Sequence, residues 1–342
     1  MACGRNRTPR CTFGAAKDYH ARVVGNTAPK NMKAIYLDTA TADTHDGPAL
    51  LEAAGFSVEH ALATTDEEVI AAAEGATAIL VGDSPISAAA ITALPDLRLI
   101  ASATVGTNHI DVAAARRHGV VVANVPDVVT EEVAVTTLAL TLGLVRHTSF
   151  LDRSVREGAW DPFATGPRHR VSGMTLGLVG FGRIGRRVAE LATPFFGAII
   201  THDPVAAVTP PVRAVTIDEL LEISNVVSLH IPAQAGQPPL IDAGRLSQMQ
   251  TGAYLINVAR GGLVDSDDLL AALDAGTIAG AAIDVLADEP PAPTAAIRTH
   301  PRIVVNPHAA FWSVEAEAAT YAHQAQNVIS WQTSGHALTP VQ

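Results

Sequence analysis

Three short segments carry polar side chains whose types could perform chemistry on a small acid. They are residues 255–265, 282–290 and 304–312, and each places a polar residue where an apolar run gives way to a loop. Arg260 in the first segment can hold a carboxylate and a carbonyl oxygen together, because its guanidinium offers several donors in one plane. Glu289 and His308, in the other two segments, form the kind of pair that gives and takes a proton near neutral pH. Together these side chains suit the reduction of a keto acid.

Upstream of these segments, residues 174–191 have the pattern of a strand, a glycine turn and a helix. Gly180 permits a tight turn, Gly182 lets the backbone approach a pyrophosphate, and Gly185 lets the helix pack closely on the strand. The N-terminus of the helix attracts the anion. Candidate cofactor contacts in this turn also include Arg183 and Ile184. We therefore predict a dinucleotide-binding turn here, in preference to a purely structural glycine turn.

Asp203 ends the next apolar strand, 18 residues after Gly185. A carboxylate at this place accepts hydrogen bonds from the adenosine ribose but repels a 2′-phosphate. Residues 204–212 contain no Arg or Lys to receive such a phosphate, and Arg213 comes late in the sequence for this purpose. The sequence therefore predicts NAD as the cofactor, in preference to NADP.

Parallel sheets are needed to bring these segments together. From residue 33 onward, short apolar strands alternate with helices, which is typical of parallel sheets covered on both faces. The expected strands are 33–38, 57–60, 76–82, 97–104 and 120–125, and a second strand–helix series runs from 174 to about 305. Ligands of such sheets bind at the carboxyl ends of the strands. The predicted fold class is α/β, with two Rossmann-like domains.

The length of the chain and one long helix predict the domain organisation. The 342 residues exceed the roughly 250–300 at which single cores stop growing, so we expect two domains. Residues 129–147 form a mostly apolar helix that needs burial, either between the domains or against another subunit. A loop rich in helix breakers follows at 160–170. We predict a substrate domain made of 32–125 and 307–342, discontinuous in sequence, and an NAD-binding domain at 126–306.

The motifs in residues 32–332 resemble those of the D-isomer-specific 2-hydroxyacid dehydrogenases. This family includes D-lactate, glyoxylate/hydroxypyruvate, phosphoglycerate, formate and phosphite dehydrogenases and the C-terminal-binding-protein corepressors. The resemblance rests on the glycine turn with Asp203, and on Asn-x-x-Arg-Gly-Gly, Asp-Val-x-x-x-Glu-Pro and Asn-Pro-His in the family's order. Residues 104–111 look like the family's substrate loop, and residues 130–134 match as well. By resemblance the protein is expected to be a homodimer that acts on a small 2-keto or 2-hydroxy acid, with the helix at 129–147 a candidate for the contact.

The resemblance implies a role for each matching residue. His308 would donate the proton when a 2-keto acid is reduced, Glu289 would hold its imidazole, and Arg260 would bind the substrate's carboxylate and keto oxygen. Backbone amides near Val105 and Gly106 would hold the other side of the carboxylate. The remaining contacts would be to the cofactor: Asp284 at the nicotinamide amide, Val258 and Ala259 beside its ring, and His230 and Pro232 on the adenosine side.

Two departures from the family pattern bear on the substrate. The aromatic pair Phe311-Trp312 follows His308 where lactate-type members have a pair ending in Tyr, so Trp312 offers an indole donor in the expected substrate wall. Thr104 and Thr107 stand in the substrate loop where many members have glycines and an acid. These differences leave the identity of the substrate open.

Two other functions fit the same residues. An NAD(H)-sensing scaffold like the corepressor relatives would keep Arg260, Glu289 and His308, so these three do not distinguish it from an enzyme. Oxidation of a small oxyanion such as formate or phosphite is the second alternative, because Arg260 could hold that anion equally well.

Composition excludes several other classes of protein. The net charge of −11 argues against a nucleic-acid partner, because the phosphate backbone would be repelled. The longest apolar run, 133–145, is short of the roughly 20 residues that span a bilayer, so no membrane partner is expected. No His-Glu-x-x-His or Cys-pair motif indicates a metal site, and no Gly-x-Ser-x-Gly elbow indicates a serine hydrolase.

Residues 1–31 differ in kind from the rest of the chain. They carry a balance of +5 and both cysteines, Cys3 and Cys11, whereas residues 32–342 carry −16. We predict that they are an appendage outside the functional fold. The lack of a thiol after Cys11 suits a reducing compartment, and we expect a cytoplasmic protein.

Overall fold

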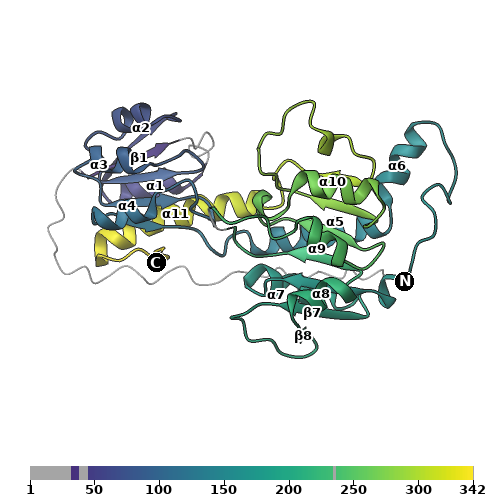
Figure 1. Cartoon of the computed structure of the whole chain (residues 1–342). Helices are drawn as coiled ribbons and strands as arrows, with labels where there is room; N and C mark the ends of the chain where they lie inside the picture. The colour runs from purple at the N-terminus through teal and green to yellow at the C-terminus, as the bar shows by residue number, and fades with distance from the viewer. Residues whose placement is uncertain (1–31, 38–44, 234–235, 342) are drawn as a thin grey trace, which may run out of the picture.

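A computed structural model of the chain describes residues 32–37, 45–233 and 236–341. The predicted N-terminal appendage, with both cysteines, lies outside the described residues. Two parallel sheets, each with its own helices, form the two parts of the molecule (Figure 1). The predicted α/β fold class with two Rossmann-like units is confirmed.

The first sheet has five strands in the order β2-β1-β3-β4-β5, all parallel. They are β1 (Met32–Leu37), β2 (Phe56–Ala61), β3 (Ala78–Val81), β4 (Leu99–Ser102) and β5 (Val121–Ala123). Their helices are α1 (Gly47–Ala53), α2 (Asp66–Ala72), α3 (Ala88–Ala93), α4 (Val112–Arg117) and α11 (Val314–Ser334). β3 and β4 are buried throughout because helices cover both faces, which explains their unbroken apolar sequences.

The second sheet has seven parallel strands in the order β12-β11-β10-β9-β6-β7-β8. They are β6 (Thr175–Val179), β7 (Ala198–His202), β8 (Arg213–Ala214), β9 (Val226–Leu229), β10 (Tyr254–Asn257), β11 (Gly280–Ile283) and β12 (Ile303–Val305). The helices of this part are α5 (Thr130–Val145), α6 (Thr148–Arg156), α7 (Arg183–Ala192), α8 (Ile217–Ile223), α9 (Ala243–Gln248) and α10 (Ser266–Asp274). The direction of chain progression reverses between β6 and β9, and ligands of doubly wound sheets bind at such a reversal.

Local sequence signals explain where the helices start. Thr65 and Glu68 form a reciprocal capping box at the start of α2, and the side chains of Ser87 and Asp111 cap α3 and α4. Ser313 caps α11, the last helix, by accepting the N–H of Ala316. These caps satisfy backbone N–H groups that the first turn of a helix leaves without a partner.

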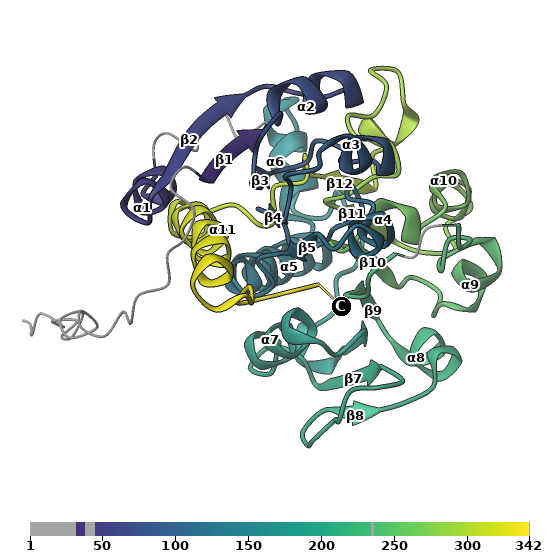
Figure 2. The same ribbon diagram turned by 90° about the vertical axis from the view of Figure 1, so that its left-hand side faces the viewer.

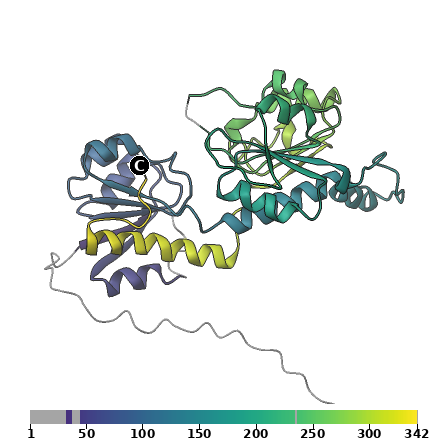
Figure 3. The same ribbon diagram turned by 90° about the horizontal axis from the view of Figure 1, so that it is seen from below.

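Two helices link the halves of the chain. α11 returns from the end of β12 to the five-stranded sheet, where Tyr321, Ala325 and Val328 join its core (Figure 3). α5 packs against α7 and the β10–β11 part of the other sheet. The two helices meet near their starts, where the Ser313 hydroxyl donates to Glu132 at 2.9 Å. Figure 2 shows α11 next to α1, against which it packs beside the five-stranded sheet.

The apolar helix predicted at 129–147 is α5, which buries six side chains within its own chain, while Val135 remains 48% exposed. The helix α6 that follows was not expected. It buries no residue and projects from the body in Figures 1 and 3. No single helix among the described residues is long and apolar enough to cross a membrane. Within the described part of the chain, one pair of helices, α5 and α6, passes that test when taken together, and the pair is bent by 60°.

Candidate active site

The glycine turn lies between β6 and α7, at the carboxyl end of the sheet. Gly180 has φ of +100°, a conformation that favours glycine, and a Cβ there would also overlap the carbonyl oxygen of His230. A Cβ at Gly185 would overlap the carbonyl oxygen of Gly180. Nothing lies within 4 Å of a Cβ at Gly182, which caps α7. The turn therefore packs closely on its inner side and leaves open space at the helix N-terminus, as a pyrophosphate requires.

Asp203 lies directly beside this turn. Its Oδ2 accepts the N–H of Phe181 at 2.7 Å, and its Oδ1 accepts those of Val205 and Ala206 at 2.9 and 2.8 Å. These hydrogen bonds, above all the one from Phe181, lower the pKa of the Asp203 carboxyl. The carboxylate is thus held in its charged form at the edge of the dinucleotide turn.

Arg183 and His230 complete the surroundings of the turn. Arg183 forms an ion pair with Asp127, which precedes α5, so the turn is tied to the segment that connects the two sheets. Burial lowers the pKa of His230 to about 4, so this imidazole is neutral. Its Nε2 lies 2.9 Å from the hydroxyl of Ser228. Pro232 is exposed two residues beyond.

Arg260 follows β10 in a turn that Asn257 organises. The Asn257 amide donates to the carbonyl of Arg260 at 2.9 Å and accepts the N–H of Ala259 at 3.1 Å. The guanidinium of Arg260 reaches the substrate loop from the other sheet, because a Cβ at Gly106 would overlap Nη2 of Arg260. The structure therefore brings these two predicted site residues together, although they are far apart in sequence. The adjacent Val258 is buried.

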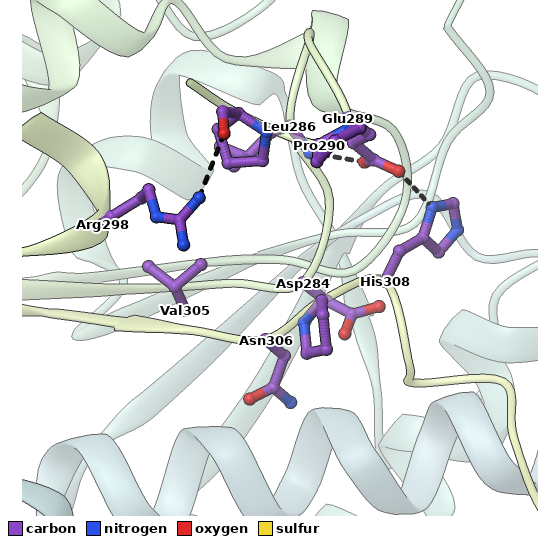
Figure 4. A pocket seen from close by; sticks show the side chains of 10 residues that line it. Asp284, Leu286, Glu289, Pro290, Arg298, Val305, Asn306 and His308 are labelled. Atoms are coloured by element: carbon purple, nitrogen blue, oxygen red, sulfur yellow. Dashed lines mark hydrogen bonds and ion pairs between the residues drawn. The ribbon is translucent and has the colours of Figure 1, made fainter. Parts of the chain in front are cut away.

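Glu289 and His308 form a direct pair (Figure 4). Nδ1 of His308 lies 2.6 Å from Oε2 of Glu289, and Oε1 of the same carboxylate accepts the N–H of Leu286 at 2.7 Å. Both oxygens of Glu289 are engaged, so its orientation is fixed. Nε2 of His308 has no hydrogen-bond partner among the described residues and is available to a substrate. The pair can hold and deliver a proton.

Asp284 holds the backbone on which His308 sits. Its carboxylate accepts the N–H groups of Ala309 and Ala310 at 3.0 and 3.1 Å, and its carbonyl accepts the N–H of His308 at 2.8 Å. His308 has φ of +52°, a backbone conformation that residues other than glycine adopt at a cost in free energy. The three hydrogen bonds offset that cost. Asp284 is only 2% exposed.

A cavity of about 500 Å³ opens beside the Glu289–His308 pair (Figure 4). It is lined by Asp284, Leu286, Glu289, Pro290, Pro291, Arg298, Val305, Asn306, Pro307 and His308. The ring of Phe311 meets the imidazole of His308 edge to face, with centroids 6.1 Å apart. Trp312, the predicted substrate wall, is 60% exposed in this structure. No cluster of three metal-ligating side chains occurs in the part of the chain that the structure describes.

Two residues near the site were missed by the sequence prediction. Asn124 donates from its side-chain amide to the carbonyl of Val105 at 2.6 Å, and so holds the substrate loop. Asp127 is the partner of Arg183. Both lie just after β5, at the carboxyl end of the five-stranded sheet, and this position was the signal that could have found them.

Comparison with known proteins shows the family of the chain. The fold and the dinucleotide turn are those of an NAD(P)-binding protein. The family profile described as "D-isomer specific 2-hydroxyacid dehydrogenase, NAD binding domain" matches residues 138–310. The chain belongs to the D-isomer-specific 2-hydroxyacid dehydrogenase family and is an oxidoreductase that acts on CH–OH groups with NAD(P).

Individual relatives cover most of the chain. A glyoxylate reductase of Thermofilum pendens is 38% identical over 72% of this chain and 75% of its own length. A glycerate dehydrogenase of Methylorubrum extorquens is 35% identical over 74% of this chain and 81% of its own length. The crystal structure of an NADPH-dependent glyoxylate/hydroxypyruvate reductase from Sinorhizobium meliloti, in complex with NADP and malonate, superposes with a TM-score of 0.79. It is 30% identical and covers 91% of this chain and 96% of that one.

Proposed function

We propose that the protein reduces a small 2-keto acid to the 2-hydroxy acid, with NADH as the preferred cofactor. The observation that carries this proposal is the Glu289–His308 pair, which holds Nδ1 at 2.6 Å from a carboxylate and leaves Nε2 free to protonate a keto oxygen. The names of the relatives, glyoxylate reductase and glycerate dehydrogenase among them, favour glyoxylate and hydroxypyruvate as the first substrates to test.

Each of the site residues has a defined task in this proposal. Arg260 and the backbone N–H groups near Gly106 bind the substrate's carboxylate from two sides, and the guanidinium also faces the keto oxygen. His308 donates the proton from Nε2 to that oxygen, and Glu289 stabilises the protonated imidazole before the transfer. The bound nicotinamide supplies the hydride for the keto carbon. In the reverse direction His308 accepts the proton from the alcohol.

Asp203 and the glycine turn favour NAD over NADP. Three backbone N–H groups keep the Asp203 carboxylate charged where the 2′-oxygen of the adenosine ribose would lie, and this charge repels a 2′-phosphate. Arg213, the first cation after Asp203, pairs with Glu219 at 2.7 Å and is engaged elsewhere. The Gly182–Arg183–Ile184 segment at the start of α7 would hold the pyrophosphate, and Val258, Ala259 and Asp284 would surround the nicotinamide.

The domain division and the oligomeric state belong to the same proposal. We take 32–125 with 307–342 as the substrate domain and 126–306 as the cofactor domain, so that the reaction occurs between the substrate loop and Arg260. Closure of the two would exclude water from the site. The homodimer would bury the exposed face of α5 that contains Val135.

One assay tests the proposal against its alternatives. Oxidation of NADH is followed with glyoxylate, hydroxypyruvate, pyruvate and bulkier 2-keto acids, and NAD reduction is followed with formate and phosphite. Turnover of a 2-keto acid, faster with NADH than with NADPH, is the expected result. Tight NADH binding without any turnover would favour a nucleotide-sensing scaffold, and turnover of formate or phosphite alone would favour an NAD-dependent dehydrogenase of a small oxyanion.

A further inference from the structure

Residues 104–106 of the substrate loop are each held through their backbone carbonyl groups. The carbonyl of Thr104 accepts the N–H of Val125 at 3.3 Å, and that of Val105 accepts the side-chain amide of Asn124 at 2.6 Å. The carbonyl of Gly106 accepts the hydroxyl of Thr104 at 2.5 Å. Three successive peptide groups are therefore fixed by their acceptors.

The N–H groups of the same peptides remain free. Val105, Gly106 and Thr107 donate no backbone hydrogen bond to any residue that the structure describes. In a trans peptide the N–H points opposite to the preceding C=O, so the hold of Asn124 on the Val105 carbonyl directs the N–H of Gly106 the other way. Gly106 also abuts the guanidinium of Arg260. Free amide donors beside a cation form an anion-binding concavity.

Asn124 is itself fixed by α11 and by the segment that follows it. Its backbone carbonyl accepts the Thr339 hydroxyl at 2.5 Å and the Asn327 amide at 3.1 Å, and its N–H donates to the carbonyl of Thr339 at 3.2 Å. Val341 donates its N–H to the carbonyl of Val122 at 2.8 Å. Residues 339–341 thus lie along β5 and fix Asn124, which in turn fixes the substrate loop.

We propose that Asn124 is a positioning residue for substrate binding, and that Thr339 fixes Asn124 in that task. Asn124 acts through Val105: it keeps the peptide of Val105 and Gly106 oriented so that the Gly106 N–H faces the substrate's carboxylate opposite Arg260. This inference rests on the proposed function, because it assigns the loop amides to a 2-keto acid. It predicts an effect on substrate affinity that is separate from cofactor binding.

The test uses Asn124→Asp, which keeps the size of the side chain but places a carboxylate oxygen against the Val105 carbonyl. Thr339→Val is the milder variant, because it removes only the hydroxyl. Asn225→Asp is the matched control: its amide also donates at 2.8 Å, to Gln250, but it lies just before β9 of the other sheet. The measurements are kcat and KM for the best 2-keto acid, the Kd of NADH, and the Kd of oxalate for the NADH complex as a probe of the carboxylate site.

We expect Asn124→Asp to raise both KM and the oxalate Kd at least tenfold, and Thr339→Val to raise them about threefold to fivefold. The Kd of NADH, and all the constants of the control, should change less than twofold. Unchanged oxalate affinity and KM in a folded Asn124→Asp would overturn the inference, as would an equal loss of NADH affinity. Should the wild type bind oxalate but reduce no keto acid, only the proposed function fails, and the oxalate constants still decide the role of Asn124.

Discussion

Glu289 holds His308 through one carboxylate oxygen, Oε2, at 2.6 Å from Nδ1, while its other oxygen accepts the N–H of Leu286. The carboxylate can therefore not rotate away from the imidazole without losing a second hydrogen bond. This arrangement fixes which ring nitrogen faces the carboxylate and which remains for the substrate.

Replacement of Glu289 by Gln should impair reduction because the neutral amide stabilises protonated His308 less well than a carboxylate does. We expect kcat to fall by about 10- to 100-fold at neutral pH. Asp288→Asn, an exposed neighbour, is the control for the loss of one charge. A kcat of Glu289→Gln equal to that of the wild type would contradict the proposed pair.

Gly106→Ala should disturb the carboxylate site directly. The added methyl group would overlap Nη2 of Arg260, so the guanidinium must move away from the substrate loop. We expect KM for the keto acid to rise at least tenfold, with NADH affinity unchanged. Gly173→Ala is a matched control, because its Cβ would have nothing within 4 Å. Steady-state kinetics of the two variants decide the point, and equal KM values would count against the assigned contact.

Asp203 should set the cofactor preference. Its charge repels a 2′-phosphate, so we expect kcat/KM for NADH to exceed that for NADPH by about 100-fold in the wild type. Asp203→Asn removes the charge but retains one oxygen as an acceptor, and should reduce the ratio about tenfold. Asp218→Asn, an exposed acid on α8, should leave the ratio unchanged. A wild type that prefers NADPH, as the Sinorhizobium meliloti relative does by its description, would refute this assignment.

His230 should make the fold sensitive to mild acid. Its folded-state pKa of about 4 lies below the ordinary value of 6.5, so the unfolded chain takes up the proton first as the pH falls. Above pH 6.5 the imidazole is neutral in both states, so the free energy of unfolding is at its full value. It decreases progressively as the pH falls from 6.5 towards 4. The loss is on the order of 3 kcal/mol, from the size of the shift.

The His230 prediction is checked by chemical denaturation between pH 7 and 4. His230→Gln should show a flatter dependence of the unfolding free energy on pH than the wild type. His118→Gln, at an exposed histidine, should keep the wild-type slope. Identical slopes for the wild type and His230→Gln would show that another group is responsible.

Much of the fold could be predicted from the sequence because its signals are local. Unbroken apolar strands indicated parallel sheets, and the spacing of Gly180, Gly182 and Gly185 indicated a turn that the structure confirms by φ and by close contacts. The helix α6 was missed because it has only nine residues and buries none of them, so its apolar pattern is short, and Phe150 packs only partly against the core.

The contacts across the site could not be predicted from the sequence because they depend on which strands become neighbours in the sheets. Asp284 was expected at the nicotinamide, and the structure shows in addition that it binds two amides after His308, since β11 pairs with β12. Asn124 belongs to none of the motifs used for the prediction, and its contact with Val105 arises from the pairing of β4 with β5. Hydrogen bonds between distant segments of the chain follow from sheet order, which local pattern does not encode.

The most direct test of the account is single-turnover hydride transfer by His308→Gln. NADH and the best 2-keto acid are mixed rapidly with excess enzyme, and the decay of NADH absorbance is compared with that of the wild type. We predict a rate constant lower by about 100- to 10,000-fold, with the Kd of NADH within twofold of the wild type. An undiminished rate of hydride transfer in a variant that binds NADH normally would contradict the assignment of His308 as the proton donor.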